Sequence, residues 1–307
     1  MKKKLILGLV GPTASGKTAV SLLLAKKTGG EIVCMDSMQI YRCMDKGTAK
    51  PTQEERAAVP HHMIDVADPG EAFSVTEYAA LAKPLLDRIP CPILVGGTGF
   101  YLRALSLPMD YGYVRGDEKL RSNYQQLAMT QGTEALHDIL KKCDPVSAAR
   151  LHPNDVRRVI RALEVFDLTG KPFSAQVMPD ESDSPYQFLL FGLDWPREAL
   201  YERIDARVDA MLADGLLDEV DRLLKSGVPE DAQSMQGLGY KELIPVLKGE
   251  ASLAEAAEMI KRKTRNYAKR QLTWFRHDDR VHWIAMDSQI SAHDILARIE
   301  SFSEDIS

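Results

Sequence analysis

The sequence predicts an α/β protein in which a parallel β-sheet is flanked by helices and carries an all-helical insert. Three observations support this fold class. Short apolar runs alternate with helical patterns at both ends of the chain, a glycine-rich loop joins the first run to the first helix, and residues 116–168 show only helical periodicity. Strands that alternate with helices favour a parallel sheet covered on both faces.

Length and composition are those of a globular protein. The 307 residues suit one α/β domain with a smaller insert, and 45% hydrophobic with 27% charged residues exclude disordered, collagen-like and disulfide-stapled chains. Thirty-nine Lys and Arg against 44 Asp and Glu give a net charge of −5. This overall balance argues against a polyanionic partner, since nucleic-acid-binding domains are commonly basic.

The cysteines and the N-terminal segment indicate a compartment. Cys34, Cys43, Cys91 and Cys143 are far apart and form no C-x-x-C pair, which favours a reduced environment. The apolar run Leu5–Val10 follows three lysines but is too short for a signal peptide or a membrane span. We therefore expect a cytoplasmic protein that makes no membrane contact.

The first part of the chain alternates between strand and helix patterns. A capping box, Ser74-Val-Thr-Glu77, opens a helix toward Ile89 that Pro84 should kink or shorten. The other predicted elements are strands at Leu5–Val10, Glu31–Met35 and Pro92–Val95, a further possible strand at Met63–Val66, and a helix at Lys17–Lys27.

The pattern then changes to helices, which predicts a core of residues 1–115 and 186–307 with a helical insert at residues 116–185. The insert ends in the polar, proline-containing stretch Gly170–Pro185. The core resumes with strands at Tyr186–Leu193 and Val281–Met286, a helix with Leu200, Ile204, Val208 and Leu212 on one face, and helices at Leu253–Phe275 and Ala292–Phe302.

The glycine-rich loop is a phosphate-binding motif. Gly11-Pro12-Thr13-Ala14-Ser15-Gly16-Lys17-Thr18 matches G-x-x-x-x-G-K-[ST] and lies between a strand and a helix, as a P-loop NTPase-like fold requires. Backbone N–H groups and the helix N-terminus would surround a di- or triphosphate, Lys17 would add a charge, and Thr18 would offer a hydroxyl to Mg²⁺. The motif does not reveal what the phosphates are attached to.

Asp36 and Thr98 follow two other predicted strands and should reach the same sheet edge as the loop. Three roles are open for Asp36: a ligand of Mg²⁺, a general base, or a cap of the following helix. Thr98 lies in Gly96-Gly-Thr-Gly99, which could equally be an ordinary turn.

Basic residues are concentrated in the segment 261–276, against the overall balance. Lys261, Arg265 and Lys269 repeat every four residues and would share a helical face, with aromatic residues interleaved. This stripe suits phosphate contacts and stacking on unpaired bases, although a solvated basic face is the alternative. Seven cations and no acid occur in the segment: Lys261, Arg262, Lys263, Arg265, Lys269, Arg270 and Arg276.

Further arginines occur in the insert and in the helix after Pro196. Arg157, Arg158 and Arg161 form a second basic cluster, so two separated surfaces suggest a long polyanion. Arg203 and Arg207 share one side of their helix and could clamp phosphate oxygens, or instead form surface ion pairs with Glu202 or Asp205.

Several segments together resemble the tRNA dimethylallyltransferases, also called tRNA isopentenyltransferases, of the bacterial type. The resemblance runs from residue 11 to 276 in the family order. The matching segments are Gly11–Thr18, Asp36–Tyr41, Pro60–Asp65, Gly96–Tyr101, His152–Asp155, Arg161–Val165, Gly239–Glu242 and Lys269–Arg276.

The resemblance implies transfer of a dimethylallyl group from dimethylallyl diphosphate to N6 of the adenosine 3′ of the anticodon in tRNA, with release of pyrophosphate. By this resemblance the loop, Gly11–Thr18, holds the donor diphosphate although it looks built for ATP, Asp36 is the catalytic base, and Thr13 and Arg207 serve catalysis at the phosphates. The implied cofactor is Mg²⁺ on Thr18.

The resemblance also implies an acceptor site for the anticodon stem-loop of tRNA, a flipped target base, and a monomeric enzyme. The positions that match the family's tRNA contacts are Asp36, Ser37, Met38, Gln39, Thr98, Arg121, Arg157, Arg158, Val159, Ile160, Arg161, Gln236, Gly237, Leu238, Gly239, Tyr240, Lys241, Lys269, Arg270, Gln271, Trp274 and Arg276.

Two other functions fit part of the sequence. A phosphotransferase that uses ATP would explain the loop but would give the seven-cation segment no role. A nucleotide-switched RNA-binding module would hold tRNA without turnover. A transfer assay run with ATP and with dimethylallyl diphosphate separates these possibilities.

Overall fold

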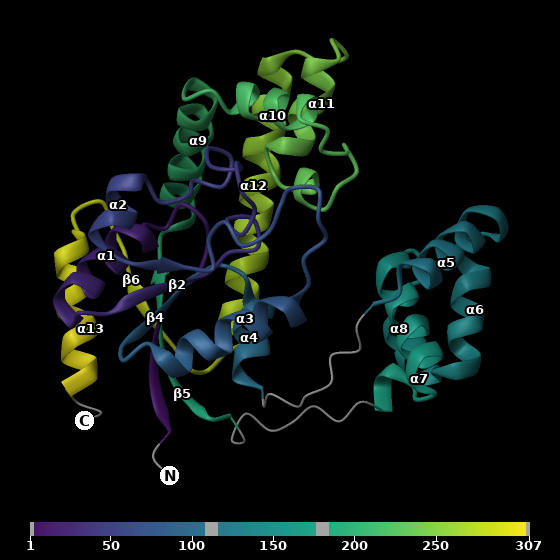
Figure 1. Ribbon diagram of the computed structural model, residues 1–307, viewed down its shortest axis with the longest axis horizontal. Coiled ribbons are helices and arrows are strands. Elements are labelled where there is room, and N and C mark those ends of the chain that lie inside the picture. The colour runs from purple at the N-terminus through teal and green to yellow at the C-terminus, as the bar shows by residue number, and fades with distance from the viewer. Residues whose placement is uncertain (1–2, 108–115, 176–183, 305–307) are drawn as a thin grey trace. The chain divides into compact units, whose positions relative to one another are not determined.

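The computed structural model describes residues 3–107, 116–175 and 184–304 (Figure 1). The chain divides into two compact units, Met1–Ser106 with Pro185–Ser307, and Leu107–Ser184. The first predicted boundary of the insert follows residues 108–115, and its polar end includes residues 176–183. Both segments lie outside the described residues.

The larger unit is built on a six-stranded sheet with the order β3-β2-β4-β1-β5-β6, in which every pair of neighbouring strands is parallel. The prediction of a parallel sheet is therefore confirmed. The strands are β1 (Lys4–Val10), β2 (Glu31–Met35), β3 (His61–His62), β4 (Pro92–Gly96), β5 (Tyr186–Asp194) and β6 (Val281–Ala285).

The register brings the carboxyl ends of three strands to one level. Gly96 of β4 is paired both with Val10 of β1 and with Met35 of β2. The segments that follow these strands, which contain the glycine-rich loop, Asp36 and Thr98, therefore emerge at the same edge.

Helices cover both faces of the sheet because successive strand side chains point to opposite sides. On one face Leu9 and Phe191 pack with residues of α1 (Lys17–Thr28) and α13 (Ala292–Glu304). On the other face Ile6 and Leu190 pack with α3 (Val75–Arg88) and α4 (Gly99–Ser106). Figure 1 shows α1 and α13 together on the side away from α3 and α4.

A helical lobe of the same unit packs against the chain that follows β2. Its core joins Ile40, Tyr41 and Met44 to apolar residues of four helices. Buried Glu219 accepts hydrogen bonds from the backbone N–H groups of Asp45, Lys46 and Gly47. The elements are α9 (Arg197–Ala213), α10 (Leu216–Lys225), η3 (Ser234–Gln236), α11 (Tyr240–Leu247) and α12 (Leu253–Arg276), with α2 (Gln53–Ala58) following the Asp45–Gly47 turn.

One local prediction is wrong. The segment Met63–Val66 is not a strand: β3 is the preceding His61–His62, and both Met63 and Asp65 have positive φ, which interrupts an extended chain. The predicted helix toward Ile89 is present as α3, which contains Pro84 and continues to Arg88. Its capping box is present, with Ser74 accepting from the N–H of Glu77.

The smaller unit has its own core of helices. Leu136 and Leu140 pack with Val159 and Leu163 on neighbouring helices, and all four are at most 1% exposed. Asp144 is fully buried, caps one helix through the N–H of Ser147 and accepts from Ser174. The elements are α5 (Glu118–Gln131), α6 (Thr133–Cys143), α7 (Pro145–Arg150), α8 (Val156–Thr169) and η1 (Phe173–Ala175).

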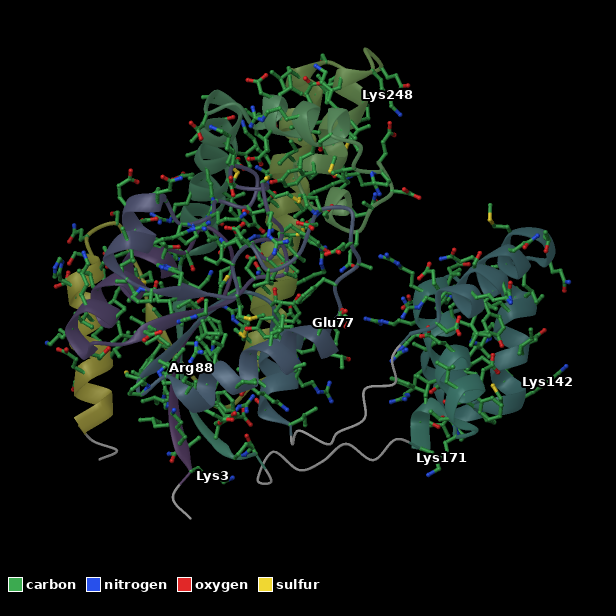
Figure 2. All side chains as sticks on the ribbon, viewed as in Figure 1. Lys3, Glu77, Arg88, Lys142, Lys171 and Lys248 are labelled. Atoms are coloured by element: carbon green, nitrogen blue, oxygen red, sulfur yellow. The ribbon has the colours of Figure 1, made fainter. Side chains whose placement is uncertain are left out.

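Charged side chains of both signs are spread over the outside of each unit, as Figure 2 shows. Among the described residues, no helix is long and apolar enough to cross a membrane.

Candidate active site

The glycine-rich loop connects β1 to α1 and curls through three residues with positive φ. These are Gly11 (φ 117°), Ala14 (φ 62°) and Gly16 (φ 97°), of which the two glycines adopt this conformation without a Cβ penalty. The ammonium group of Lys17 folds back over the loop. It donates to the carbonyl oxygens of Gly11 and Pro12 at 3.1 and 2.5 Å.

The surroundings of Lys17 disfavour its charged form. Its pKa is lowered from 10.5 to about 7, chiefly by burial and also by the positive charge of Arg207, while the carboxylate of Asp36 acts in the opposite direction. Burial also lowers the pKa of Arg207, again against the attraction of Asp36. Two cations close together in a desolvated site favour an anion as a third partner.

Helix α9 holds the other side of the loop. The Nε of Arg203 donates to the carbonyl oxygen of Ala14 at 2.9 Å, and its guanidinium lies 4.3 Å from the ring centroid of Trp195. The alternative of a surface ion pair with Asp205 is wrong, because Asp205 pairs with Arg265 of α12 instead. Within the described part of the chain, neither Arg203 nor Arg207 forms an ion pair.

Asp36 directly follows β2, where one of its carboxylate oxygens has a structural role. Its Oδ1 accepts from the backbone N–H of Met38 at 2.8 Å and of Gln39 at 3.4 Å. Its Oδ2 has no hydrogen-bond partner in the described residues. The capping role is therefore present, and one oxygen is left for chemistry.

Thr98 and Gln271 form hydrogen bonds that join the segments emerging at this edge of the sheet. The hydroxyl of Thr98 accepts from the N–H of Ser37 at 3.2 Å, which joins the segments after β4 and β2. Gln271 of α12 is 6% exposed and contacts the backbone of Thr13 and Gly97. The expectation that Thr98 reaches the edge of Asp36 is thus confirmed.

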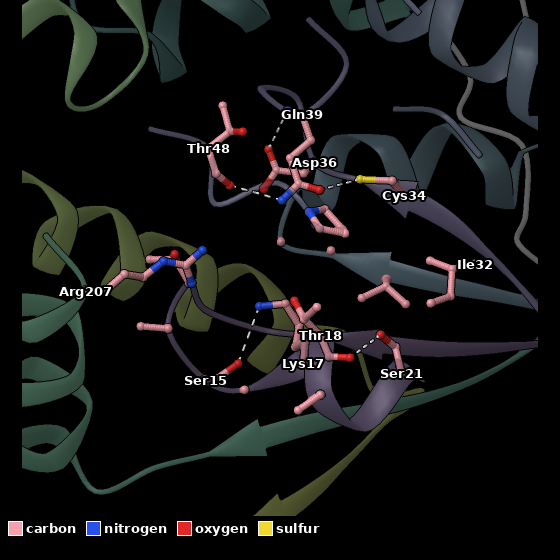
Figure 3. A pocket seen from close by; sticks show the side chains of 18 of the residues that line it. Ser15, Lys17, Thr18, Ser21, Ile32, Cys34, Asp36, Gln39, Thr48 and Arg207 are labelled. Atoms are coloured by element: carbon pink, nitrogen blue, oxygen red, sulfur yellow. Dashed lines mark hydrogen bonds between the residues drawn. The ribbon is translucent and has the colours of Figure 1, made fainter. Parts of the chain in front are cut away.

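Two cavities meet at these residues. A cavity of about 550 Å³ is lined by the loop residues Thr13–Thr18, and a second of about 350 Å³ is lined by Ser37, Met38, residues 236–240, Tyr267 and Arg270. Figure 3 shows Asp36 on one side of the first cavity and Lys17 and Thr18 on the other, with Arg207 reaching in from α9. The walls shared by both cavities contain Thr13, Ala14, Asp36, Thr48 and Arg207.

Several positions predicted as surface contacts are buried instead. Val159 and Ile160 are 0% and 5% exposed in the core of the smaller unit, because they occupy the inner face of α8. Tyr240 is fully buried and donates to Glu219, although its ring also lines the second cavity. Val159 and Ile160 therefore support the helix from inside, and Tyr240 forms part of a cavity wall.

The predicted basic stripe on α12 is partly neutralised. Lys261 pairs with Asp209 at 2.8 Å, and Arg265 pairs with Asp205 at 2.5 Å, so this part of the helix is held against the acidic side of α9. The interpretation of Lys261 and Arg265 as free phosphate contacts is therefore wrong. The cations that stay exposed are Arg262, Lys269, Arg270 and Arg276.

In the smaller unit, a buried acid orients two arginines. Glu164, fully buried, pairs with the Nε of Arg121 at 2.8 Å and with Arg161, and it accepts from the N–H of Asp117 at 2.7 Å. Burial acts to raise the pKa of Glu164, but these hydrogen bonds bring it below its ordinary value. Arg157 and Arg158 are exposed.

Sequence reasoning missed two residues of the shared site. Thr48 lines both cavities and gave no sequence signal, since it lies in an irregular segment. Tyr267 lines the second cavity and was visible only as one of the aromatic residues of the basic segment. Burial raises its pKa, and the charge of Asp36 raises it further.

Comparison with known proteins places the chain in a family. The model of the IPP transferase family matches residues 39–278, and the isopentenyl transferase model matches residues 4–65. A tRNA dimethylallyltransferase of Pelotomaculum thermopropionicum is 47% identical, covering 99% of this chain and 98% of its own. The chain belongs to the tRNA dimethylallyltransferase family.

Solved tRNA dimethylallyltransferases have the same fold. The full-length tRNA isopentenylpyrophosphate transferase of Bacillus halodurans superimposes with a TM-score of 0.71 at 45% identity, covering 99% of this chain and 98% of that one. A eukaryotic dimethylallyltransferase described as acting on tRNA gives 0.80 at 28% identity, covering 98% and 80%. The two family models together cover both cavities, because residues 4–65 and 39–278 contain all the residues that line them.

Proposed function

We propose that this chain transfers the dimethylallyl group of dimethylallyl diphosphate to N6 of the adenosine 3′ of the anticodon in tRNA and releases pyrophosphate. One observation carries the proposal. A phosphate-binding cavity and a second cavity share a wall at Thr13, Asp36 and Arg207. This is the arrangement that a transferase needs to bring two substrates to one point.

The donor diphosphate would occupy the larger cavity. The loop Gly11–Thr18 supplies backbone N–H groups, α1 presents its N-terminus, and Lys17 and Arg207 supply charge. A bound diphosphate would raise the depressed pKa of Lys17, because it gives the two cations a common anionic partner.

The acceptor base would occupy the smaller cavity. Its walls combine apolar groups such as Met38, Val208 and Ile260 with an aromatic ring, Tyr267, and one exposed cation, Arg270. This mixture suits a nucleobase that has left its stack, which needs flat apolar contacts and few polar ones. The anticodon stem-loop would extend over the exposed cations of α12 and over Arg121, Arg157, Arg158 and Arg161 of the insert.

The reaction needs a base and a stabilised leaving group. The lone pair of N6 is delocalised into the purine, so removal of its proton must accompany formation of the bond between N6 and C1 of the donor. The free Oδ2 of Asp36 would accept that proton. The bond between C1 and the bridging oxygen breaks, and Lys17, Arg207 and the side chain of Thr13 would stabilise the charge on pyrophosphate.

Mg²⁺ is part of the proposal. The cavity wall offers the hydroxyl of Thr18, and oxygen ligands together with substrate phosphates suit this ion. Bound there, Mg²⁺ would neutralise diphosphate charge. We further propose that the enzyme is a monomer and cytoplasmic, and the free state of all four cysteines supports the second point.

The test is a transfer assay with unmodified tRNA, Mg²⁺ and labelled dimethylallyl diphosphate, with labelled ATP in a parallel reaction. We expect label in tRNA from the isoprenoid donor alone. Transfer of the γ-phosphate of ATP would instead establish a phosphotransferase, and tight tRNA binding without any turnover would establish an RNA-binding module.

A further inference from the structure

Gln271 is the only α12 residue that lines the phosphate-binding cavity, within the described part of the chain, and both ends of its amide are engaged. Its Oε1 accepts from the backbone N–H of Thr13 at 2.9 Å, and its Nε2 donates to the carbonyl oxygen of Gly97 at 3.0 Å. The side chain thus spans from α12 to the phosphate-binding loop and to the segment after β4.

The packing around Gln271 is tight. A Cβ at Gly97 would lie 2.0 Å from the Nε2 of Gln271, and a Cβ at Gly99 would lie 2.0 Å from the Nε1 of Trp274. Real Cβ atoms do not approach other atoms so closely, so the two glycines let α12 reach the sheet edge. The amide of Gln271 is therefore held in one position by its surroundings.

Gln271 also lies beside the wall of the other cavity. The polar side chains of Gln271 and Thr98 act to lower the pKa of Tyr267, against the burial that raises it. Tyr267 lines the smaller cavity, one helical turn before Gln271 on α12. One buried side chain therefore links the backbone of the phosphate-binding loop to an aromatic wall of the proposed base pocket.

We propose that Gln271 is a positioning residue: by accepting from the N–H of Thr13 it fixes the backbone of the loop 11–16, and with it the donor diphosphate, relative to the acceptor pocket. The proposal rests on the proposed function for the location of the donor. It replaces direct contact with tRNA as the role of this residue, because the side chain is 6% exposed and both its amide oxygen and its amide nitrogen already bind backbone groups of the protein.

The first experiment compares Gln271→Met with a matched control, Gln289→Met. Methionine keeps the length of the side chain and removes both hydrogen bonds, while Gln289 is exposed in the turn before α13. For Gln271→Met we expect kcat/KM for dimethylallyl diphosphate to fall by about tenfold to a hundredfold, since small misplacements of reacting groups carry costs of this order. The dissociation constant for tRNA should stay within about twofold, as should all constants of the control.

A readout without substrates tests the same contact. In the free protein, hydrogen exchange of the loop 11–16 should become faster in Gln271→Met and stay unchanged in Gln289→Met, because the N–H of Thr13 loses its acceptor. This result is independent of what the cavity binds. Absence of prenyl transfer by the unaltered protein would thus overturn the proposed function, whereas unchanged exchange would overturn the role of Gln271.

A second variant guards against a simple folding defect. Gly97→Ala leaves Gln271 in place but pushes its amide away. If both changes act through this one contact, the double variant should lose no more kcat/KM than the worse single variant, to within about twofold. Fully multiplicative losses, or a fall in tRNA affinity of about fivefold or more with an unchanged donor KM, would contradict the proposal.

Discussion

Arg203 holds the glycine-rich loop, residues 11–16, from outside: its Nε donates to the carbonyl oxygen of Ala14 at 2.9 Å. Ala14 is one of the loop residues with positive φ, and Arg203 is fixed in turn by the ring of Trp195. The guanidinium thus meets two demands at once, a directed hydrogen bond and a flat stacking contact. Lysine has no planar group and cannot meet both demands at once in this geometry.

Arg203→Lys should therefore loosen the loop without removing charge. We expect the KM for dimethylallyl diphosphate to rise by about three- to tenfold with a smaller change in kcat, because the hydrogen bond from Nε and the flat stacking on Trp195 are lost. Steady-state kinetics with saturating tRNA measures this. Arg197→Lys, on the same helix and exposed beside Tyr201, is the control and should behave as the unaltered protein.

Asp36→Asn should abolish most of the proposed proton transfer. The amide oxygen can still accept from the N–H of Met38, so the turn is kept, while the basic oxygen is lost. We expect the single-turnover rate of transfer to fall by about 10²- to 10⁴-fold with nearly unchanged tRNA affinity. Asp221→Asn, which removes only an exposed ion pair with Lys225, is the control. A rate within about threefold of normal would rule out Asp36 as the base.

Binding of the donor should depend on pH through Lys17. Its pKa of about 7 in the free protein means that the ammonium form declines as the pH rises through 7, so affinity for a diphosphate should decrease in the same interval. Below pH 7 Lys17 is already protonated, so binding of the diphosphate should be accompanied by little proton uptake. Near and above pH 7, Lys17 should take up a proton when the diphosphate binds. Calorimetry of pyrophosphate binding in buffers of different ionisation enthalpy measures that uptake.

The control for this pH dependence is Arg207→Met. The cation of Arg207 lowers the pKa of Lys17, so its removal should raise that pKa and move the interval of proton uptake to higher pH, although affinity falls overall. An interval that does not move would show that a different group is responsible.

Glu164→Gln should destabilise the smaller unit. A neutral amide cannot balance Arg121 and Arg161 in a buried position, and we expect a loss of about 1–3 kcal/mol in the free energy of unfolding. The folded-state pKa of Glu164 is lowered, so its contribution is present above the unfolded pKa and disappears as the pH falls through the folded one. Urea unfolding of the full chain at pH 7 and at pH 4 measures both effects.

Exposed Glu134 of α6 supplies the control for this change. Glu134→Gln should alter the free energy of unfolding by less than about 0.5 kcal/mol, as is usual for surface positions. If Glu164→Gln behaves in the same way, the buried carboxylate is not what orders the two arginines.

Local patterns predicted most of the sheet. The strands β1, β2, β4, β5 and β6 are buried apolar runs, and α1, α3, α12 and α13 have clear periodicity or a capping box, so each is visible in a short window. The failures also have local causes. The two-residue strand β3 is held by pairing with β2 rather than by its own composition, and α2, with no buried residue, carries little apolar signal.

The site was predictable where backbone chemistry defines it. The loop has glycine at two positions of positive φ and lysine at one fixed position, and all of them lie within eight consecutive residues, so a short window of sequence reveals the motif. The role of Gln271 and the neutralisation of Lys261 and Arg265 were not predictable. Their partners, Thr13, Asp209 and Asp205, lie far away along the chain, and only packing selects them.

The sequence by itself determined the parallel sheet, the phosphate-binding loop and the presence of Asp36 at the sheet edge, because hydrophobic periodicity and glycine act over a few residues. Only the tertiary structure decided which cations stay exposed, which oxygen of Asp36 is free, and that two cavities share one wall. Those properties depend on which distant side chains desolvate and pair with each group, and no short window of sequence contains both partners.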